Sequence, residues 1–183
     1  LRRDWSSDVC SSDLRLVFLG DLVDRGENSP KVVTMVAGMV VGGNAQCVLG
    51  NHELNILINH QRPGAEWYWG GTRLLSGDGR PVLGCTATAT EKTNFIRFAG
   101  NLPLALVRDD LRVVHACWHQ PSINQVRAYS CAATAHRVFE EQVSVKKKET
   151  TDRRERWLID QNEHPVKVIT SGLERATTTP FEA

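Results

Sequence analysis

Residues 16–26 read LVFLGDLVDRG, in which an apolar run meets a loop of charged residues. The apolar run, closed by Gly20, indicates a strand buried in a parallel sheet. The loop then presents two carboxylates, Asp21 and Asp24, and the guanidinium of Arg25. Carboxylate oxygens suit divalent cations, and a guanidinium suits the oxygens of a phosphate. The stretch therefore predicts an α/β fold with a ligand site at the carboxyl end of a strand.

A second strand is expected to end in the same way. A helix is predicted to begin after a cap at Asn28 or Ser29 and to run to Val41, and it leads to the apolar run Cys47–Leu49. The tetrapeptide GNHE, residues 50–53, follows that run and begins another helix. The amide oxygen of Asn51 can ligate a metal ion, and the imidazole of His52 can donate a proton. This strand end therefore offers a second set of groups to the same site.

A histidine follows a third predicted strand. Residues 104–108 and 111–115 alternate in polarity around an Asp-Asp turn, which predicts a β-hairpin ending at His115. Taken singly, the three signals have ordinary interpretations as a turn, a helix cap and a core histidine. Because each side chain follows a strand, we expect Asp21, Asn51 and His115 to converge on one pocket.

The remaining segments have weaker patterns. Residues 61–90 are rich in Gly, Trp and Arg and lack periodicity, which predicts a long loop or insertion over the mouth of the site. Its aromatic triplet, residues 67–69, could stack on a substrate or pack the insertion onto the domain. Helices are predicted over residues 90–99 and 132–143, a solvated charged segment over 146–156 and a short strand over 166–169.

Composition narrows the class of protein. The chain has 183 residues, 41% of them hydrophobic, and 22 Lys and Arg against 21 Asp and Glu give a net charge of +1. This length suits one domain, and the charge balance predicts no strong bulk binding of nucleic acid or of anionic membranes. No apolar run approaches the roughly 18 residues of a membrane span. Five cysteines without a CxxC pair are typical of reduced thiols, so we expect a cytoplasmic protein.

The first residues differ from the rest of the chain. Residues 4–14, DWSSDVCSSDL, resemble the conceptual translation of a DNA sequencing-library adapter. The alternative is a disordered tail rich in Ser and Asp. We therefore expect an adapter-like tail over residues 1–14, excluded from the fold, and a partial domain over residues 15–183.

Together, GDLVDRG, GNHE and the strand-terminal His115 resemble the motifs of the calcineurin-like metallophosphoesterases. The branch they resemble contains protein Ser/Thr phosphatases and bacterial symmetrical dinucleoside-tetraphosphatases. The likeness is specific over residues 16–115 and looser to the end of the chain. It implies a four-layer αββα sandwich around a pair of metal ions, which we expect to be truncated here at both the amino and the carboxyl end.

The resemblance also implies roles for single residues. Asp21 resembles the carboxylate that bridges both metal ions, and Asn51 and His115 resemble ligands of the second ion. His52 resembles the proton donor to the leaving group, and Asp24 resembles the carboxylate that orients it. A neighbouring carboxylate favours the protonated imidazole, which is the form that a general acid needs.

Two further residues belong to the motifs. Arg25 resembles a phosphate-binding arginine, which would offset charge on the transferred phosphoryl group. Glu53 completes GNHE, and the resemblance gives it no direct role here.

Two parts of the family pattern are missing from the sequence. The family has an Asp-x-His pair after an earlier strand, which ligates the first metal ion, and no such pair precedes Asp21. It also has a last histidine ligand, for which His119, His136 and His164 are candidates, none of them at a predicted strand end. We therefore expect that ligand to be lost with the carboxyl end, and the activity to be impaired, since a site stripped of ligands binds metal poorly.

The function implied is that of a dimetal-dependent phosphoesterase. It would hydrolyse phosphate monoester, diester or anhydride bonds by attack of a metal-bound hydroxide. The expected cofactors are two divalent metal ions, Mn²⁺ first, with Fe or Zn as alternatives. The substrate is expected to be a phosphorylated small molecule, a nucleotide such as a dinucleoside polyphosphate, a nucleic-acid end or a phosphoprotein, and the oligomeric state is left open. The alternative is a non-catalytic binding module that kept the fold without its metals.

Overall fold

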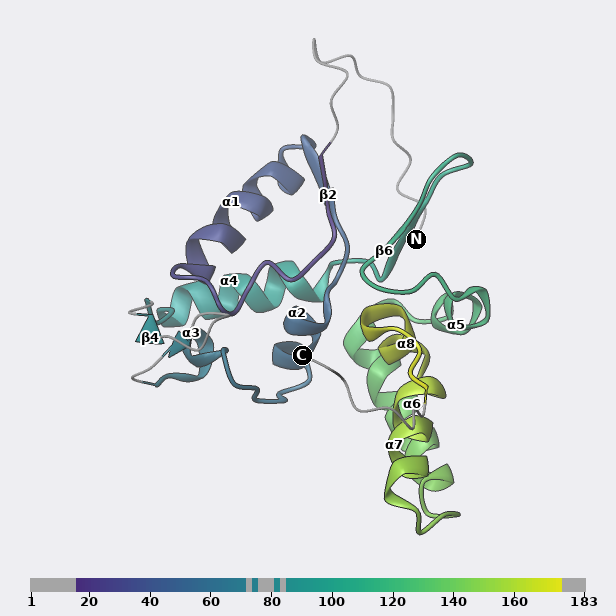
Figure 1. The fold of residues 1–183 in the computed structure, drawn as a ribbon. Coiled ribbons are helices and arrows are strands. Elements are labelled where there is room, and N and C mark those ends of the chain that lie inside the picture. Colours follow the sequence, from purple (N-terminus) through teal and green to yellow (C-terminus); the bar gives the residue numbers. More distant parts are fainter. Residues whose placement is uncertain (1–15, 72–73, 76–80, 83–84, 176–183) are drawn as a thin grey trace.

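The computed structural model describes residues 16–71, 74–75, 81–82 and 85–175, with strands and helices in the first part of the chain and helices in the last (Figure 1). In chain order the elements are β1 (Leu16–Phe18), α1 (Ser29–Val41), β2 (Ala45–Cys47), α2 (Asn51–Leu57), α3 (Glu66–Trp69), β3 (Leu74–Leu75), β4 (Pro81–Val82), α4 (Ala89–Gly100), β5 (Ala105–Val107), β6 (Arg112–Val114), α5 (Gln120–Val126), α6 (Ala132–Lys146), α7 (Arg153–Asn162) and α8 (Pro165–Ser171).

The first three elements form the parallel strand pair that the opening motif predicts. β1 and β2 run in parallel, with Val17 opposite Gln46, and α1 is the crossover between them. The side chain of Asn28 caps α1 by accepting a hydrogen bond from the backbone N–H of Lys31. Because the two strands run the same way, the loops that follow them leave from the same edge.

The predicted hairpin is also present. β5 and β6 are antiparallel, with Leu106 opposite Val113, and His115 follows β6 directly. The strands among the described residues form three two-stranded sheets. The mixture of strands and helices agrees with an α/β fold, and the four-layer sandwich stays a prediction.

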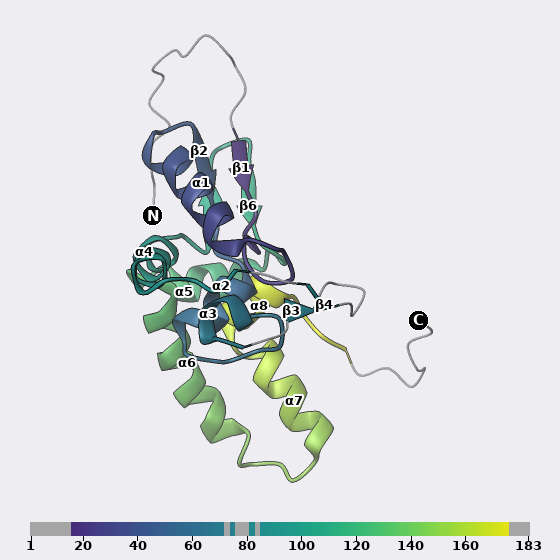
Figure 2. The ribbon, with the colours of Figure 1, turned by 90° about the vertical axis from the view of Figure 1, so that its left-hand side faces the viewer.

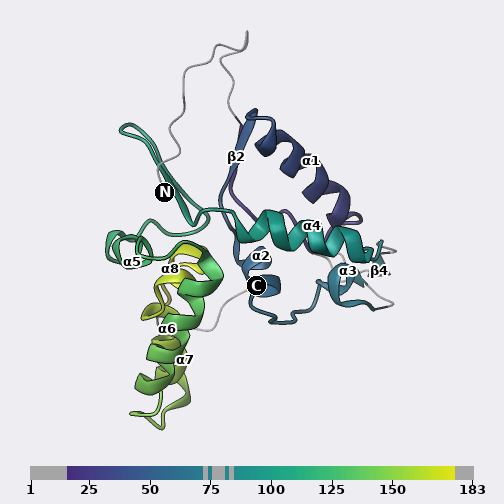
Figure 3. The same ribbon diagram turned by 180° about the vertical axis from the view of Figure 1, so that it is seen from behind.

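The helices lie in two groups on either side of α2. α2 packs against α4 on one side and against α6 and α8 on the other, and α8 also contacts α5 and α7. α6 and α7 run side by side away from the strands as a helical hairpin (Figures 2 and 3). The strand loops and α2, which carry the sequence motifs, therefore lie between the two groups.

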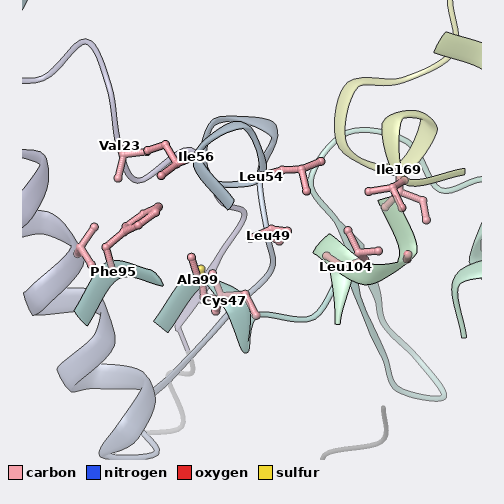
Figure 4. Packing of buried hydrophobic residues seen from close by; sticks show 14 of the residues in the cluster. Val23, Cys47, Leu49, Leu54, Ile56, Phe95, Ala99, Leu104 and Ile169 are labelled. Carbon is pink, nitrogen blue, oxygen red and sulfur yellow. The ribbon is translucent and has the colours of Figure 1, made fainter. Parts of the chain in front are cut away.

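One row of buried side chains connects these groups (Figure 4). The row includes Val23 from the loop after β1, Leu49 directly before GNHE, and Leu54 and Ile56 from α2. The core therefore extends to the loops that carry the motifs. Complete burial of such a side chain stabilises the fold by about 1.5–3 kcal/mol. The labelled members are Val23, Cys47, Leu49, Leu54, Ile56, Phe95, Ala99, Leu104 and Ile169.

The short strand predicted over residues 166–169 is wrong, since these residues belong to α8. Val166, Val168 and Ile169 are all 0% exposed, and a short run buried on every side does not distinguish a strand from a helix. The local signals that decide are His164, whose side chain caps the helix, and Pro165 in its first turn.

The segment over residues 61–90 is more ordered than a loop. It contains α3 and the short strands β3 and β4, none of which is long enough to show periodicity in sequence. Trp67, in α3, is 2% exposed and belongs to the core. For this residue the packing interpretation is therefore confirmed. The helix α5 was not predicted either, whereas the helices expected over residues 29–41, 90–99 and 132–143 are α1, α4 and α6.

His164 is a core histidine that connects α6 to α8. Its ring, which is fully buried, packs against the ring of His136, with the centroids 4.4 Å apart and the ring planes tilted by 41°. Nε2 donates to the backbone carbonyl of His136 at 3.1 Å, and Nδ1 accepts from the backbone N–H of Lys167 at 3.4 Å. Burial, together with the nearby His136 and Lys167, lowers the pKa of His164 to about 4.

This buried histidine predicts a loss of stability in acid. Between its ordinary pKa of 6.5 and its folded pKa of about 4, His164 takes up a proton in the unfolded chain but not in the folded protein. The free energy of unfolding should therefore fall by about 3 kcal/mol as the pH falls through this window. Urea unfolding at several pH values measures the loss. His164→Asn, which can still cap α8 but does not titrate, should show a shallower slope, and an unchanged slope would contradict the assignment.

No helix within the described residues has both the length and the apolar character needed to cross a lipid bilayer.

Candidate active site

The structure brings Asp21, Asn51 and His115 together, as the sequence predicts. Nε2 of His115 lies 3.1 Å from Oδ1 of Asn51 and 3.4 Å from Oδ1 of Asp21. The three side chains come from the loop after β1, from the first residue of α2 and from the residue after β6. The convergence of three strand ends on one point is confirmed.

The spacing of these atoms suits a divalent cation. Two ligands at right angles on one ion, each with a bond of about 2.1 Å, lie about 3 Å apart. Nδ1 of His115 donates a hydrogen bond to the backbone carbonyl of Leu19, which fixes the ring and leaves Nε2 facing Asp21 and Asn51. One nitrogen and two oxygens as donors therefore fit the metal ion that the family pattern implies.

The charges of this group are coupled. A hydrogen bond with Asp21 raises the pKa of His115, against the lowering effect of burial. Burial acts to raise the pKa of Asp21, but the hydrogen bond with His115 and the charges of His115 and His52 outweigh it and hold that pKa below its ordinary value. The carboxylate of Asp21 is thus kept ionised, which is the state that binds a cation.

A second set of side chains lies beside the first. Nδ1 of His52 is 2.6 Å from Oδ2 of Asp24, and Nε2 of His52 is 3.4 Å from Nη2 of Arg25. Nε2 is also 3.9 Å from Oδ2 of Asp21. The hydrogen bond that His52 donates to Asp24 raises the pKa of His52, although burial acts to lower it. The nitrogen that could donate a proton therefore faces Arg25 and the candidate metal ligands.

Glu53 connects the two motif loops. This side chain is fully buried, and its carboxylate accepts hydrogen bonds from the backbone N–H groups of Asp21 at 2.9 Å, Leu22 at 2.7 Å and Gly50 at 3.1 Å. Burial raises the pKa of Glu53, while the backbone donors act to lower it. Nothing in the local sequence assigns this residue a role, since an acidic residue in the first turn of a helix is ordinary.

The backbone of the site is strained and tightly packed. Asp21, Asp24 and Arg25 have φ values of 53°, 70° and 59°, in the left-handed region that non-glycine residues rarely occupy. The loops approach so closely that a Cβ on Gly50 would lie 2.5 Å from the backbone nitrogen of Asp21, and Gly20 has a φ of 88°. Both glycines are therefore required by the close approach.

The three candidates for a last histidine ligand make their described hydrogen bonds away from Asp21, Asn51 and His115. His119 bonds to Ser122 at the start of α5, at 2.8 Å. His136, Glu140 and His164 form a group whose potential ligand atoms lie within 4.8 Å of one another. In that group both ring nitrogens of His164 already have backbone partners, as described above.

The carboxylate of this second group already has a cationic partner. Nζ of Lys167 is 2.9 Å from Glu140 and 2.8 Å from Asp160. The group is therefore a polar connection between α6, α7 and α8. Lys147 joins the same network through Asp160, so part of the charged segment predicted to be solvated is paired.

Comparison with known proteins leads to the same family as the sequence motifs. The family model described as Calcineurin-like phosphoesterase matches residues 11–172. A protein named "Bis(5'-nucleosyl)-tetraphosphatase, symmetrical" from Janthinobacterium sp. (strain Marseille) is 31% identical over 113 residues, which are 60% of this chain and 35% of that protein. Proteins of the same name from Ralstonia nicotianae (strain ATCC BAA-1114 / GMI1000) and Marinomonas sp. (strain MWYL1) are each 32% identical, over 55% and 57% of this chain and 32% and 35% of their own length.

The chain thus spans about a third of the length of these relatives. No solved structure gives a significant match. The matched family range begins at residue 11, outside the described residues, and the domain boundary at residue 15 stays a prediction.

Proposed function

The chain belongs to the calcineurin-like phosphoesterase family, and on that premise we propose that it hydrolyses phosphate ester or anhydride bonds with the help of divalent metal ions. The observation that carries the proposal is the position of Nε2 of His52, which lies 3.4 Å from the guanidinium of Arg25 and 3.9 Å from Asp21. A proton donor, a phosphate-binding cation and a candidate metal ligand thus face one another.

Each residue has a chemical task in this proposal. Asp21, Asn51 and His115 would hold a divalent cation, with Asp21 shared with a second one. Such ions, when bound, polarise phosphate oxygens and lower the pKa of water. Arg25 would bind the oxygens of the phosphate through its planar guanidinium. Mn²⁺ is the ion that we propose first, with Fe or Zn as alternatives.

His52 would transfer the proton that the leaving group needs. As the bond between phosphorus and the leaving oxygen breaks, the proton on Nε2 moves to that oxygen. Asp24 holds Nδ1 of the same ring at 2.6 Å, which keeps Nε2 directed toward the substrate and stabilises the charged imidazole.

The names of the relatives support a dinucleoside tetraphosphate as substrate. Those proteins are named symmetrical bis(5'-nucleosyl)-tetraphosphatases, and we propose the same substrate class for this chain ahead of phosphoproteins and nucleic-acid ends. As the architecture of the domain we propose the four-layer αββα sandwich of the family, which the mixture of strands and helices supports.

The activity is expected to be weak unless metal is in excess. Among the described residues, one ion would have three candidate ligands, Asp21, Asn51 and His115. The second ion would have only Asp21. A single carboxylate holds a divalent cation loosely. We therefore expect impaired turnover that rises with Mn²⁺ into the millimolar range.

Incubating the chain with diadenosine tetraphosphate or p-nitrophenyl phosphate in excess Mn²⁺ tests the proposal. Hydrolysis should appear in Mn²⁺ and disappear in EDTA, and symmetrical cleavage of the tetraphosphate should give ADP as the sole nucleotide product. A chain that binds these compounds without converting them would support the non-catalytic module instead. Undiminished hydrolysis in EDTA would contradict the role of metal ions.

A further inference from the structure

The carboxylate of Asp24 has a partner on each of its oxygens. Oδ2 accepts from Nδ1 of His52 at 2.6 Å, and Oδ1 accepts from the indole Nε1–H of Trp67 at 2.7 Å. The side chain of Asp24 is 2% exposed, so water does not compete for either oxygen. Burial of a carboxylate is costly unless hydrogen-bond donors satisfy its oxygens. Trp67 supplies one of the two side-chain donors.

Trp67 is itself held in place from several sides. Its ring is 2% exposed and meets the rings of Phe95 and Tyr68 edge to face, with centroids 5.4 Å and 5.5 Å apart. Its backbone carbonyl accepts a hydrogen bond from Ala87 at 2.7 Å. A large aromatic ring fixed by such contacts has little rotational freedom. The indole N–H is therefore a donor at a fixed point.

This fixed donor determines how Asp24 can face His52. An indole N–H can only donate, so its bond to Oδ1 of Asp24 keeps that oxygen as its acceptor. Rotation of the carboxylate would break that bond in a buried site, at the cost of an unsatisfied donor. Oδ2 is consequently left to the imidazole, in one orientation.

We propose that Trp67 is a positioning residue for His52 and that it acts through Asp24. The proposal rests on the proposed function, in which His52 donates a proton to the leaving group. Trp67 touches neither that group nor the phosphate. It fixes the carboxylate, which in turn fixes the ring that carries the proton.

A comparison of substrates with different leaving groups distinguishes a positioning role of Trp67 from a role in packing alone. A poor leaving group such as phenolate needs a well-placed proton donor, whereas p-nitrophenolate, a weaker base, leaves with little help. Loss of positioning should therefore slow phenyl phosphate far more than p-nitrophenyl phosphate. A general loosening of the core should slow both alike.

Trp67→Phe removes the indole N–H and keeps an aromatic ring. In excess Mn²⁺ we expect kcat for phenyl phosphate to fall by about 10-fold to 100-fold, with KM little changed. For p-nitrophenyl phosphate the fall should be at most about threefold. Equal losses for both substrates, or no loss for phenyl phosphate, would overturn the proposal.

Trp69→Phe is the matched control. Trp69 lies in the same short helix, and its buried indole nitrogen has no hydrogen-bond partner among the described residues. Removal of that N–H should leave the rates for both substrates at the level of the parent chain. Because Trp67→Phe could also disturb folding, replacement of Trp67 by benzothienylalanine, in which sulfur takes the place of the N–H, should reproduce the selective loss.

A measurement without substrate keeps the test independent of turnover. The Nδ1–H proton of His52, deshielded by its hydrogen bond to Asp24 and protected from exchange with water, should give a downfield proton NMR signal, which His52→Asn identifies by its loss. In Trp67→Phe this signal should broaden or vanish, while Trp69→Phe should retain it. An unchanged signal in Trp67→Phe would overturn the positioning role, and absence of phosphoesterase turnover with the signals behaving as expected would count against the proposed function alone.

Discussion

His52→Asn is expected to lower kcat by about 10²–10⁴-fold while the content of bound metal stays the same, because the change removes the proposed general acid and keeps the proposed metal ligands. In the structure His52 contacts Asp24 and Arg25, and none of the atoms directed at the candidate cation belongs to its ring. The rate is measured with phenyl phosphate in excess Mn²⁺, and bound Mn²⁺ is measured in parallel by elemental analysis.

The control for this variant is His60→Asn, which changes an exposed histidine after α2. It should behave like the parent chain. If His52→Asn lost bound Mn²⁺ together with activity, His52 would be a metal ligand and the assignment of the proton donor would be wrong. A rate close to that of the parent would show that another group protonates the leaving oxygen.

Glu53→Ala is expected to cost about 2–5 kcal/mol of the free energy of unfolding and to abolish metal binding. The substitution leaves the backbone N–H groups of Asp21, Leu22 and Gly50 without their acceptor. The loss costs about 1–3 kcal/mol at the buried Gly50 and less at the partly buried bonds of Asp21 and Leu22. The loop whose backbone is held at positive φ should then relax, which moves Asp21 away from His115. Urea unfolding and Mn²⁺ titration followed by calorimetry measure the two effects.

Glu91→Ala is a matched control for the helix cap alone. Glu53 and Glu91 both close the first turn of their helices by accepting a hydrogen bond from the capping residue. Glu91 is partly exposed, and its described hydrogen bonds join it to Thr88 alone, so its loss should cost about 1 kcal/mol or less. Equal costs for Glu53→Ala and Glu91→Ala would mean that the bridge between the loops contributes nothing.

The parts of the site that follow strands could be predicted from sequence because the strand edge places them. An apolar run with a polar residue at its end was enough to predict Asp21, Asn51 and His115 as site residues. The parallel pairing of β1 with β2 then places the first two at the same edge of the sheet. Trp67 and Glu53 could not be found in this way. Their partners are 43 and 32 residues distant in sequence, and neither residue type in its local context indicates a bond to a distant loop.

The fold shows the same division. Helix α1 has a cap, a proline in its first turn and a glycine at its end, so its bounds are specified locally. The apolar run in α8 is equally compatible with a strand, and the helix is specified by the residues before the run, the cap at His164 and Pro165 in the first turn. β2 lies at Ala45–Cys47 rather than at Cys47–Leu49, because the backbone N–H of Leu49 bonds to Pro103 instead of continuing the strand pair.

If His115 and Asp21 hold a cation as proposed, the bond from His115 to the carbonyl of Leu19 makes the alignment of the strands a condition for binding it. A slip of β1 by one residue against β2 would turn its side chains to the opposite face and carry the Leu19 carbonyl and Asp21 away from the imidazole. A misaligned chain would then have no complete set of ligands. An ion that binds only the correctly aligned chain would shift the population toward that alignment by mass action. The metal would then favour correct folding in addition to its part in the reaction.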